Sequence, residues 1–144
     1  MKKLYAVMAA ALLLCGLLTA CSSKTESAND VDLTGFYNAL AEKYGWGDDM
    51  MDLDSDMLEM YYPGLGDIAA KQFLAKAPVM SYAVSEYVFL QADSEQDAAQ
   101  AAKILQTRID SQADGDAFYP ETIDQWKAAK VLQNGAYVAM IASG

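Results

Sequence analysis

A short apolar run near the N-terminus limits how much of this 144-residue chain can fold. The run extends from Leu4 to Leu18 and follows two lysines, Lys2 and Lys3. A membrane-spanning helix needs about 20 apolar residues, so this run is too short to cross a bilayer comfortably. Its length and basic flank are typical of a secretory signal peptide, which is removed from the mature protein. The folded part then has about 110 residues, enough for one domain without disulfides or metals.

The residues at the end of this run resemble the lipobox of bacterial lipoproteins. A lipobox is a leucine, two small residues and an obligatory cysteine, and this chain has Leu18, Thr19, Ala20 and Cys21 in that order. The resemblance implies that residues 1–20 are a lipoprotein signal peptide. It also implies that Cys21 receives a diacylglyceryl group, with chains such as palmitate, and becomes the mature N-terminus. Two acyl chains suit stable anchoring. The alternatives are an uncleaved N-terminal anchor and a secretory signal cut after Ala20.

The expected location is therefore the extracytoplasmic face of the cell membrane, with the membrane as a partner through the lipid on Cys21. Residues 21–31 contain the small, polar, aperiodic stretch SSKTESANDV, which is typical of a flexible tether. Because Cys15 would leave with the signal peptide, the mature chain would have no free thiol and no possible disulfide. A single folded domain is expected over residues 32–144.

The charge of the chain disfavours two kinds of binding. The sequence has 10 basic and 20 acidic residues, a formal net charge of −10. Loss of Lys2 and Lys3 with the signal peptide leaves eight basic residues and a net charge of −12. Such a surface repels phosphate backbones, so nucleic-acid binding is not expected. It also repels anionic lipid headgroups, so the acyl chains rather than charge would hold the protein at a membrane.

Apolar periodicity predicts two long helices. The apolar residues of Leu33–Tyr44 recur with the spacing of one helical face, between a capping Asp32 and a terminating Gly45. A second helix follows Ser94, which has capping-box spacing with Asp97, and ends near Ser111.

Two short helices are expected between the longer elements. One lies in DMLEMYYPG, where Asp56 and Glu59 have capping-box spacing and a Pro-Gly pair marks the end. The other opens with Pro120 in its first turn and runs to about Trp126. The acidic, methionine-bearing stretch GWGDDMMDLD is expected to be a loop.

Four strands are expected, in two hairpins. Residues 67–77 are ambiguous between helix and strand, and a strand is favoured by their alternation. The run AVSEYVFLQA places Val84, Val88 and Leu90 on one face and Tyr87 and Phe89 on the other. The pair Asn134–Gly135 lies between two β-rich runs and is the type I′ hairpin signal. The predicted fold class is α+β: a four-stranded antiparallel sheet of two hairpins packed with a long helix, plus an N-terminal helix.

The region from Val84 to Ile141 resembles a family of small bacterial lipoproteins, domain-of-unknown-function family 4358, found mostly in Gram-positive anaerobes. The resemblance is carried by SEYVFLQADSEQDAAQAAKILQTRIDSQ, then YPE, then NGAYVAMIAS. These motifs are structural rather than chemical. Because the family carries no settled activity, the resemblance implies a location and a fold but no function.

The residue types available for catalysis are few. The chain contains no histidine. With no free cysteine after lipidation, Ser–His–Asp and Cys–His devices are excluded. A pair of carboxylates remains conceivable, but no sequence feature selects one pair, so no catalytic residue is assigned and the chain is not expected to be an enzyme.

One stretch approaches the template of a calcium-binding loop. Residues 110–121, DSQADGDAFYPE, would offer five ligand positions, namely Asp110, Gln112, Asp114, Asp116 and Glu121. Glutamine at the third position and proline at the eleventh depart from the template. The alternative is that Gly115 simply ends one helix and that Glu121 begins the next, as first-turn acids do. This alternative is favoured, so no cofactor is expected, with calcium as the candidate that this stretch would bind.

The function expected from the sequence is a binding or interaction module of the cell envelope, with an envelope protein or a small ligand as partner. Trp46, Tyr61 or Tyr62 beside acidic stretches would suit a recognition patch, and each would equally suit the core. A calcium-dependent binding protein using residues 110–121 is the second hypothesis, and a carboxylate-based hydrolase is the third.

The lipidation hypothesis predicts the behaviour of a Cys21→Ala variant. Without the sulfur that accepts the lipid, the variant is expected to lose fatty-acid labelling and to leave the membrane fraction. Metabolic labelling and fractionation measure both effects. A Cys15→Ala variant is the matched control and should label as the natural chain does. Unchanged labelling of Cys21→Ala would refute the assignment.

Overall fold

The computed structural model describes residues 30–46, 49–80 and 83–144. The proposed signal peptide, the lipobox residues and most of the proposed tether lie outside the described residues. Asp32–Gly144 form one compact unit. Its elements follow one another as α2 (Leu33–Tyr44), β1 (Met50–Asp52), α3 (Ser55–Tyr61), η1 (Leu65–Asp67), β2 (Ala70–Pro78), β3 (Ser85–Ala92), α4 (Glu95–Ser111), η2 (Gln112–Asp116), η3 (Pro120–Thr122), α5 (Ile123–Ala128), β4 (Lys130–Asn134) and β5 (Tyr137–Ser143).

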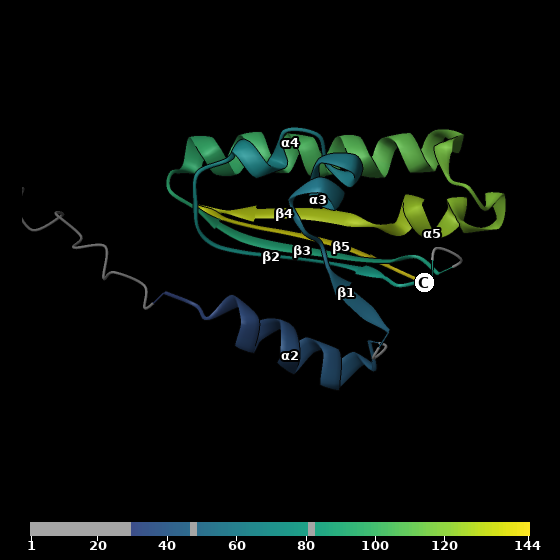
Figure 1. Cartoon of the computed structure of the whole chain (residues 1–144), viewed down its shortest axis with the longest axis horizontal. Helices are drawn as coiled ribbons and strands as arrows, with labels where there is room; N and C mark the ends of the chain where they lie inside the picture. Colours follow the sequence, from purple (N-terminus) through teal and green to yellow (C-terminus); the bar gives the residue numbers. More distant parts are fainter. Residues whose placement is uncertain (1–29, 47–48, 81–82) are drawn as a thin grey trace, which may run out of the picture. The chain divides into compact units, whose positions relative to one another are not determined.

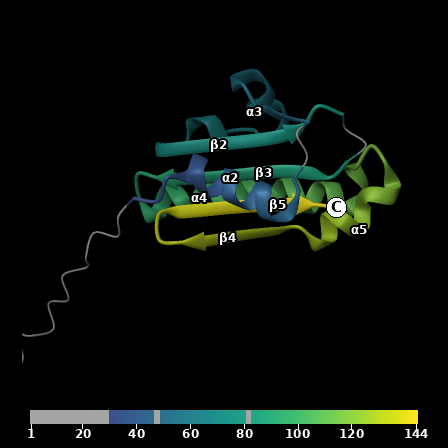
Figure 2. The ribbon, with the colours of Figure 1, turned by 90° about the horizontal axis from the view of Figure 1, so that it is seen from below.

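The strands form one antiparallel sheet in the order β1-β2-β3-β5-β4. Figure 2 shows β2, β3, β5 and β4 side by side in that order. The two predicted hairpins are present, and they are joined where β3 pairs with β5 along its length. Helices α3 and α4 lie on one face of the sheet and α2 lies on the other (Figure 1). The prediction of an α+β fold with a long helix and an N-terminal helix is confirmed, and so is the strand assignment for much of residues 67–77.

The sheet has five strands, so the prediction of four was wrong. The extra strand, β1, lies in the stretch that was expected to be a loop, and it pairs with the end of β2. Three residues are too few to show a period, and Asp52 on this edge forms an ion pair with Lys76 at 2.6 Å. Charge on a short edge strand discourages pairing with other chains, which explains why the strand does not resemble a strand in sequence.

Side-chain alternation along β3 builds two separate cores. Val84, Val88 and Leu90 pack under α4, against the buried alanines and Leu105 of that helix. Tyr87 and Phe89 point to the other face, where Leu33 and Tyr37 of α2 cover them. The two faces predicted for β3 are therefore confirmed. Every residue from Glu86 to Ala92 is buried, as expected of a central strand covered on both sides.

One helix end agrees with the sequence prediction and another differs from it. Ser94 caps α4 by accepting a hydrogen bond from the Asp97 amide at 3.1 Å, as predicted. The cap of α3, however, is Asp54, whose Oδ1 accepts from the Met57 amide at 2.9 Å. Asp56 lies inside the first turn, so the proposed pairing of Asp56 with Glu59 was wrong. Spacing alone did not distinguish two aspartates two residues apart.

The turn between β4 and β5 also differs from the prediction. Asn134 pairs with Tyr137, so Gly135 and Ala136 form the two-residue loop. Gly135 has φ of 57°, whereas no described non-glycine residue has a positive φ. A type I′ turn needs positive φ at both loop residues, so that assignment was wrong; a type II′ turn needs it only at the first.

The revised cap of α3 makes a stability prediction. Asp54→Ala removes the side chain that satisfies the Met57 amide and should lower the free energy of unfolding by about 0.5–2 kcal/mol. Asp56→Ala removes only a charge near the helix N-terminus and should cost about 0.3–1 kcal/mol at most. Urea unfolding of both variants measures the difference. A larger loss for Asp56→Ala would contradict the assigned cap.

Candidate functional site

The least expected feature of the structure is a glutamate inside the core. Glu86 lies on β3 between Val84 and Val88, on the face that packs against α4, and it is 4 % exposed. A buried carboxylate is costly unless it is paired and hydrogen-bonded. Its partners therefore identify a place where the fold has been arranged around a charge.

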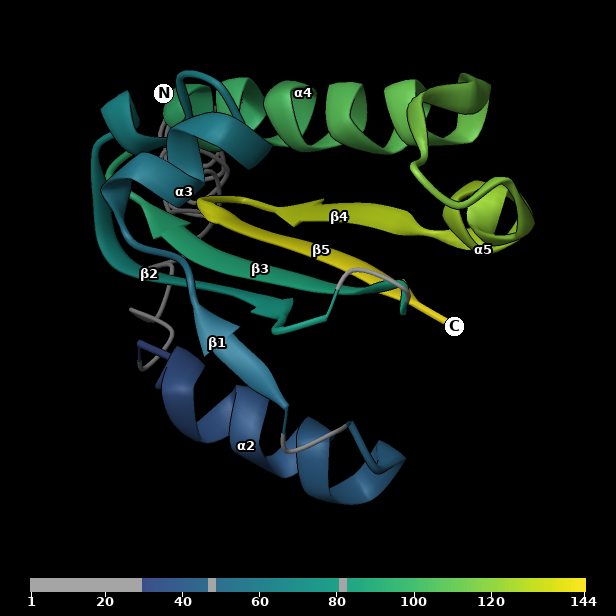
Figure 3. The ribbon, with the colours of Figure 1, turned by 45° about the vertical axis from the view of Figure 1, so that its right-hand side comes forward.

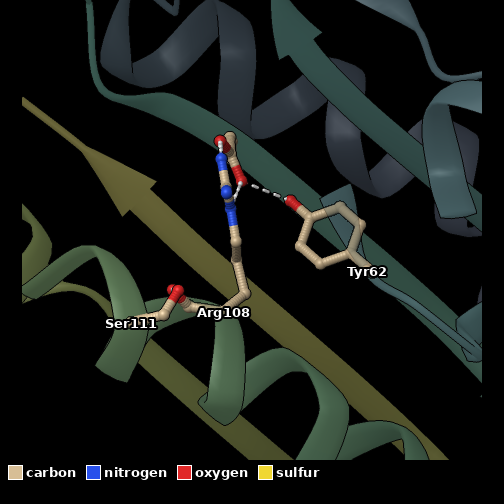
Figure 4. A network of polar contacts seen from close by, with 4 residues as sticks. Tyr62, Arg108 and Ser111 are labelled. Atoms are coloured by element: carbon tan, nitrogen blue, oxygen red, sulfur yellow. Dashed lines mark hydrogen bonds and ion pairs between the residues drawn. The ribbon is translucent and has the colours of Figure 1, made fainter. Parts of the chain in front are cut away.

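Arg108 and Tyr62 supply these partners (Figure 4). The Arg108 Nη2 donates to Glu86 Oε1 at 2.6 Å, and its Nε donates to Glu86 Oε2 at 3.2 Å. The Tyr62 hydroxyl donates to the same Oε2 at 2.6 Å. A carboxylate held at both oxygens by one guanidinium has a fixed orientation. Among the described residues, no buried side-chain nitrogen or oxygen is left without a partner.

Aromatic rings hold the guanidinium from two further directions. The Arg108 Cζ lies 5.0 Å from the ring centroid of Tyr61 and 5.2 Å from that of Trp126. Both distances are within the range of cation–π attraction. The Ser111 hydroxyl donates to the Arg108 backbone carbonyl at 3.2 Å, near the end of α4. Arg108 is thus fixed by contacts from α3, β3 and α5.

The sequence explains how neighbouring tyrosines come to have different roles. Tyr61 ends α3, and the Pro63–Gly64 pair stops the helix there, with Gly64 at φ of 82°. Tyr62 follows the helix and turns into the core, where it is fully buried. Tyr61 remains half-buried and faces the space beside α4.

The electrostatics of the cluster favour one charge state. Burial raises the pKa of Tyr62, and the charge of Glu86 and its hydrogen bond raise it further, so this pKa lies well above its ordinary value of 10.0. Burial works against the charge of Arg108, but the hydrogen bonds and charge of Glu86 outweigh that effect, and the pKa of Arg108 is raised. The cluster therefore holds a neutral tyrosine and a cationic arginine.

Two adjoining hollows lie around Arg108, and we call them together the α3–α4 recess. The larger has a volume of about 440 Å³ and is lined by Met60, Tyr61, Pro63, Ile104, Thr107, Arg108, Ser111, Gln112 and Asp116. The smaller, of about 110 Å³, lies toward Phe118, Tyr119 and Trp126. Tyr61, Arg108 and Gln112 line both hollows. The larger volume is within the range of about 300–1,000 Å³ that holds small ligands.

The arrangement is suited to binding rather than to proton transfer. A general acid or base must reach a substrate, yet both oxygens of Glu86 accept hydrogen bonds from Arg108 and Tyr62 inside the protein. What faces the recess is a half-buried aromatic ring, the edge of a guanidinium whose charge Glu86 balances, and small polar groups. These groups can form hydrogen bonds and apolar contacts with a ligand.

The structure places the predicted calcium ligands on three successive elements. Asp110 is in the last turn of α4, where its Oδ1 accepts from Gln106 Nε2 at 2.7 Å. Gln112, Asp114 and Asp116 lie in the π-turn η2, and Glu121 lies in η3. Within the described ranges, no group of three acidic, histidine or cysteine residues is placed to hold a metal ion. Gln112 and Asp116 line the recess. Calcium binding by this stretch stays a prediction.

The three aromatic residues that the sequence indicated as recognition candidates lie in three different places. Tyr62 is in the core and Tyr61 lines the recess. Trp46 lies on the α2 face and stacks on Tyr87, with ring centroids 3.9 Å apart. The sequence patterns did not indicate Glu86 or Arg108 as site residues. One signal could have found them: Glu86 has the same alternation as Val84 and Val88, which places it on a buried face of the strand. A buried carboxylate needs a buried cation as its partner.

The fold and the recess define a small α+β domain with a buried Tyr–Glu–Arg cluster beside an open hollow. Residues 43–143 match the family described as a domain of unknown function, DUF4358, and the chain belongs to that family. The match begins in the last turn of α2 and covers every strand that the structure describes. No curated protein and no solved structure matches the chain. In the part of the chain that the structure describes, no helix has the length and hydropathy needed to span a bilayer.

The raised pKa of Tyr62 predicts an alkaline loss of stability. Folding favours the protonated hydroxyl, so this contribution is complete below pH 10.0 and disappears as the pH rises above it. The free energy of unfolding should fall by up to about 1.4 kcal/mol per pH unit for this one group. Tyr62→Phe should show a shallower fall, while Tyr44→Phe, at an exposed position, should behave as the natural chain does. Urea unfolding at increasing pH measures the slopes, and equal slopes for Tyr62→Phe and the natural chain would contradict the account.

Proposed function

We propose that the chain is a lipid-anchored binding module of the cell envelope, held at the extracytoplasmic face of the cytoplasmic membrane of a Gram-positive bacterium. The lipobox residues Leu18–Cys21 support the anchor, since a cysteine after a short apolar run is otherwise unexplained in a chain without histidine. The polar stretch up to Val31 supports a tether that would hold the domain away from the lipid surface.

The α3–α4 recess carries the binding part of this proposal. Its wall is held in place at Arg108. The Arg108 guanidinium forms an ion pair with Glu86 and cation–π contacts with the rings of Tyr61 and Trp126. A recess with fixed walls binds at a lower entropic cost than one that must form during binding. The polar groups Thr107, Ser111 and Gln112 stand on its α4 side and can orient a ligand.

The same observations favour binding over hydrolysis for this site. Hydrolysis by carboxylates needs one acid with a raised pKa and one ionised acid, both facing the substrate. The recess offers Asp116 at its edge, while the buried Glu86 is engaged by Arg108 and Tyr62. The cluster fixes the shape of the recess wall, so Glu86 and Tyr62 act as positioning residues for Arg108.

A crosslinking experiment in intact cells tests the proposed function. A photoreactive amino acid replaces Met60, which lines the recess and is 76 % exposed, and a matched control replaces Leu132, which is 62 % exposed on β4. Irradiation should give covalent adducts from position 60 and none from position 132. Both proteins must be found in the membrane fraction. Equal adducts from both positions, or none from position 60, would contradict binding at the recess.

A further inference from the structure

We propose that the occupant of the α3–α4 recess is an apolar segment of a partner protein that carries lysine or arginine side chains. This inference rests on the proposed binding function and names the chemistry of the partner. Three observations carry it: an exposed apolar rim, an excess of negative charge at one end, and the extension of that rim from the larger hollow to the smaller one.

The apolar rim comes from three separate segments of the chain. Met60 of α3 and Phe118, between η2 and η3, line the recess and are 76 % and 83 % exposed. Val79 is also exposed and follows Pro78, which lines the smaller hollow. Exposed apolar residues that surround a hollow mark an interaction site, whereas scattered ones need no explanation. Methionine and aromatic residues are also enriched where proteins meet.

The charge at the C-terminal end of α4 is negative, and among the described residues Asp110, Asp114 and Asp116 form no ion pair. Asp110 lies in the last turn of α4, and Asp114 and Asp116 lie in η2, which follows it; the helix dipole adds further negative charge there. Figure 3 shows this end of α4, from which the chain turns toward α5. Arg108 is the one base among the residues that line the two hollows, and Glu86 neutralises it at 2.6 Å. A cationic partner is therefore attracted to this end, and an anionic one is repelled.

The extent of the rim favours a protein segment over a small ligand. A compound that filled the larger hollow, between Met60 and Asp116, would leave Phe118 and Val79 in water, because Phe118 lines only the smaller hollow and Val79 follows a residue that does. An extended or helical segment would cover all of these side chains and place its basic groups near the aspartates. A lipid surface is disfavoured, since the acidic domain repels anionic headgroups.

Binding of designed peptides to the purified full chain tests the inference. Three peptides of equal length combine leucine with lysine, with glutamine or with glutamate. The leucine–lysine peptide is expected to bind most tightly, and added salt should weaken it. Phe118→Ala should weaken its binding at least about fivefold, because the variant loses the aromatic side chain that the bound peptide would bury. Replacing Asp114 and Asp116 by asparagine should weaken it about twofold to fivefold per charge.

The controls separate specific docking from general attraction to an acidic protein. Asp124→Asn removes an exposed acid in α5 and should leave the affinity unchanged, and thermal unfolding should show that Phe118→Ala remains folded. Preferential binding of the glutamate peptide, equal binding of all three, or affinities unaffected by Phe118→Ala and the asparagine variants would overturn the inference. Adducts from position 60 would then still support the binding module with a different partner, whereas their absence would remove both proposals.

Discussion

The alternation of side chains along β3 is the constraint on which the rest of the structure depends. This strand is central in the sheet and buried on both faces, so each of its residues must satisfy one of two cores. Val88 and Leu90 require α4 on one side, and Tyr87 and Phe89 require α2 on the other. A shift of the strand by one residue would exchange the two sets and place Glu86 among the aromatic rings of the α2 face.

One buried polar residue on each face of β3, Glu86 on one and Gln91 on the other, makes the packing of the two helices specific. On the α4 face, Glu86 fixes Arg108. On the α2 face, Gln91 accepts a hydrogen bond from Gln72, whose side-chain oxygen accepts from the Leu33 amide at the start of α2. A buried ion pair adds little net stability, but loss of one partner leaves an isolated charge and costs about 3–5 kcal/mol. The cluster around Glu86 therefore contributes mainly a fixed position for Arg108, and with it the shape of the recess.

Local signals predicted the elements well where they were long or had a unique cap. The cap residue Ser94 and the alanine-rich apolar face that follows it predicted α4, and Asp32 and Gly45 predicted the two ends of α2. These signals work because caps and periodicity act within a few residues. The same signals failed at β1, which has three residues and no period, and at α3, where two aspartates competed for the cap. They also misplaced the hairpin turn by one residue, since Gly135 is compatible with either position in the loop.

The sequence by itself determined the α+β class, the long helices, the two hairpins, and the family whose residues it shares. Only the tertiary structure decided the site. Tyr62, Glu86 and Arg108 are separated by more than twenty residues from one another along the chain, and no local rule relates them. They are in contact because the apolar core packs β3 against α4. A charged side chain is tolerated inside that core only where the fold also brings its hydrogen-bonding and ion-pair partners to it.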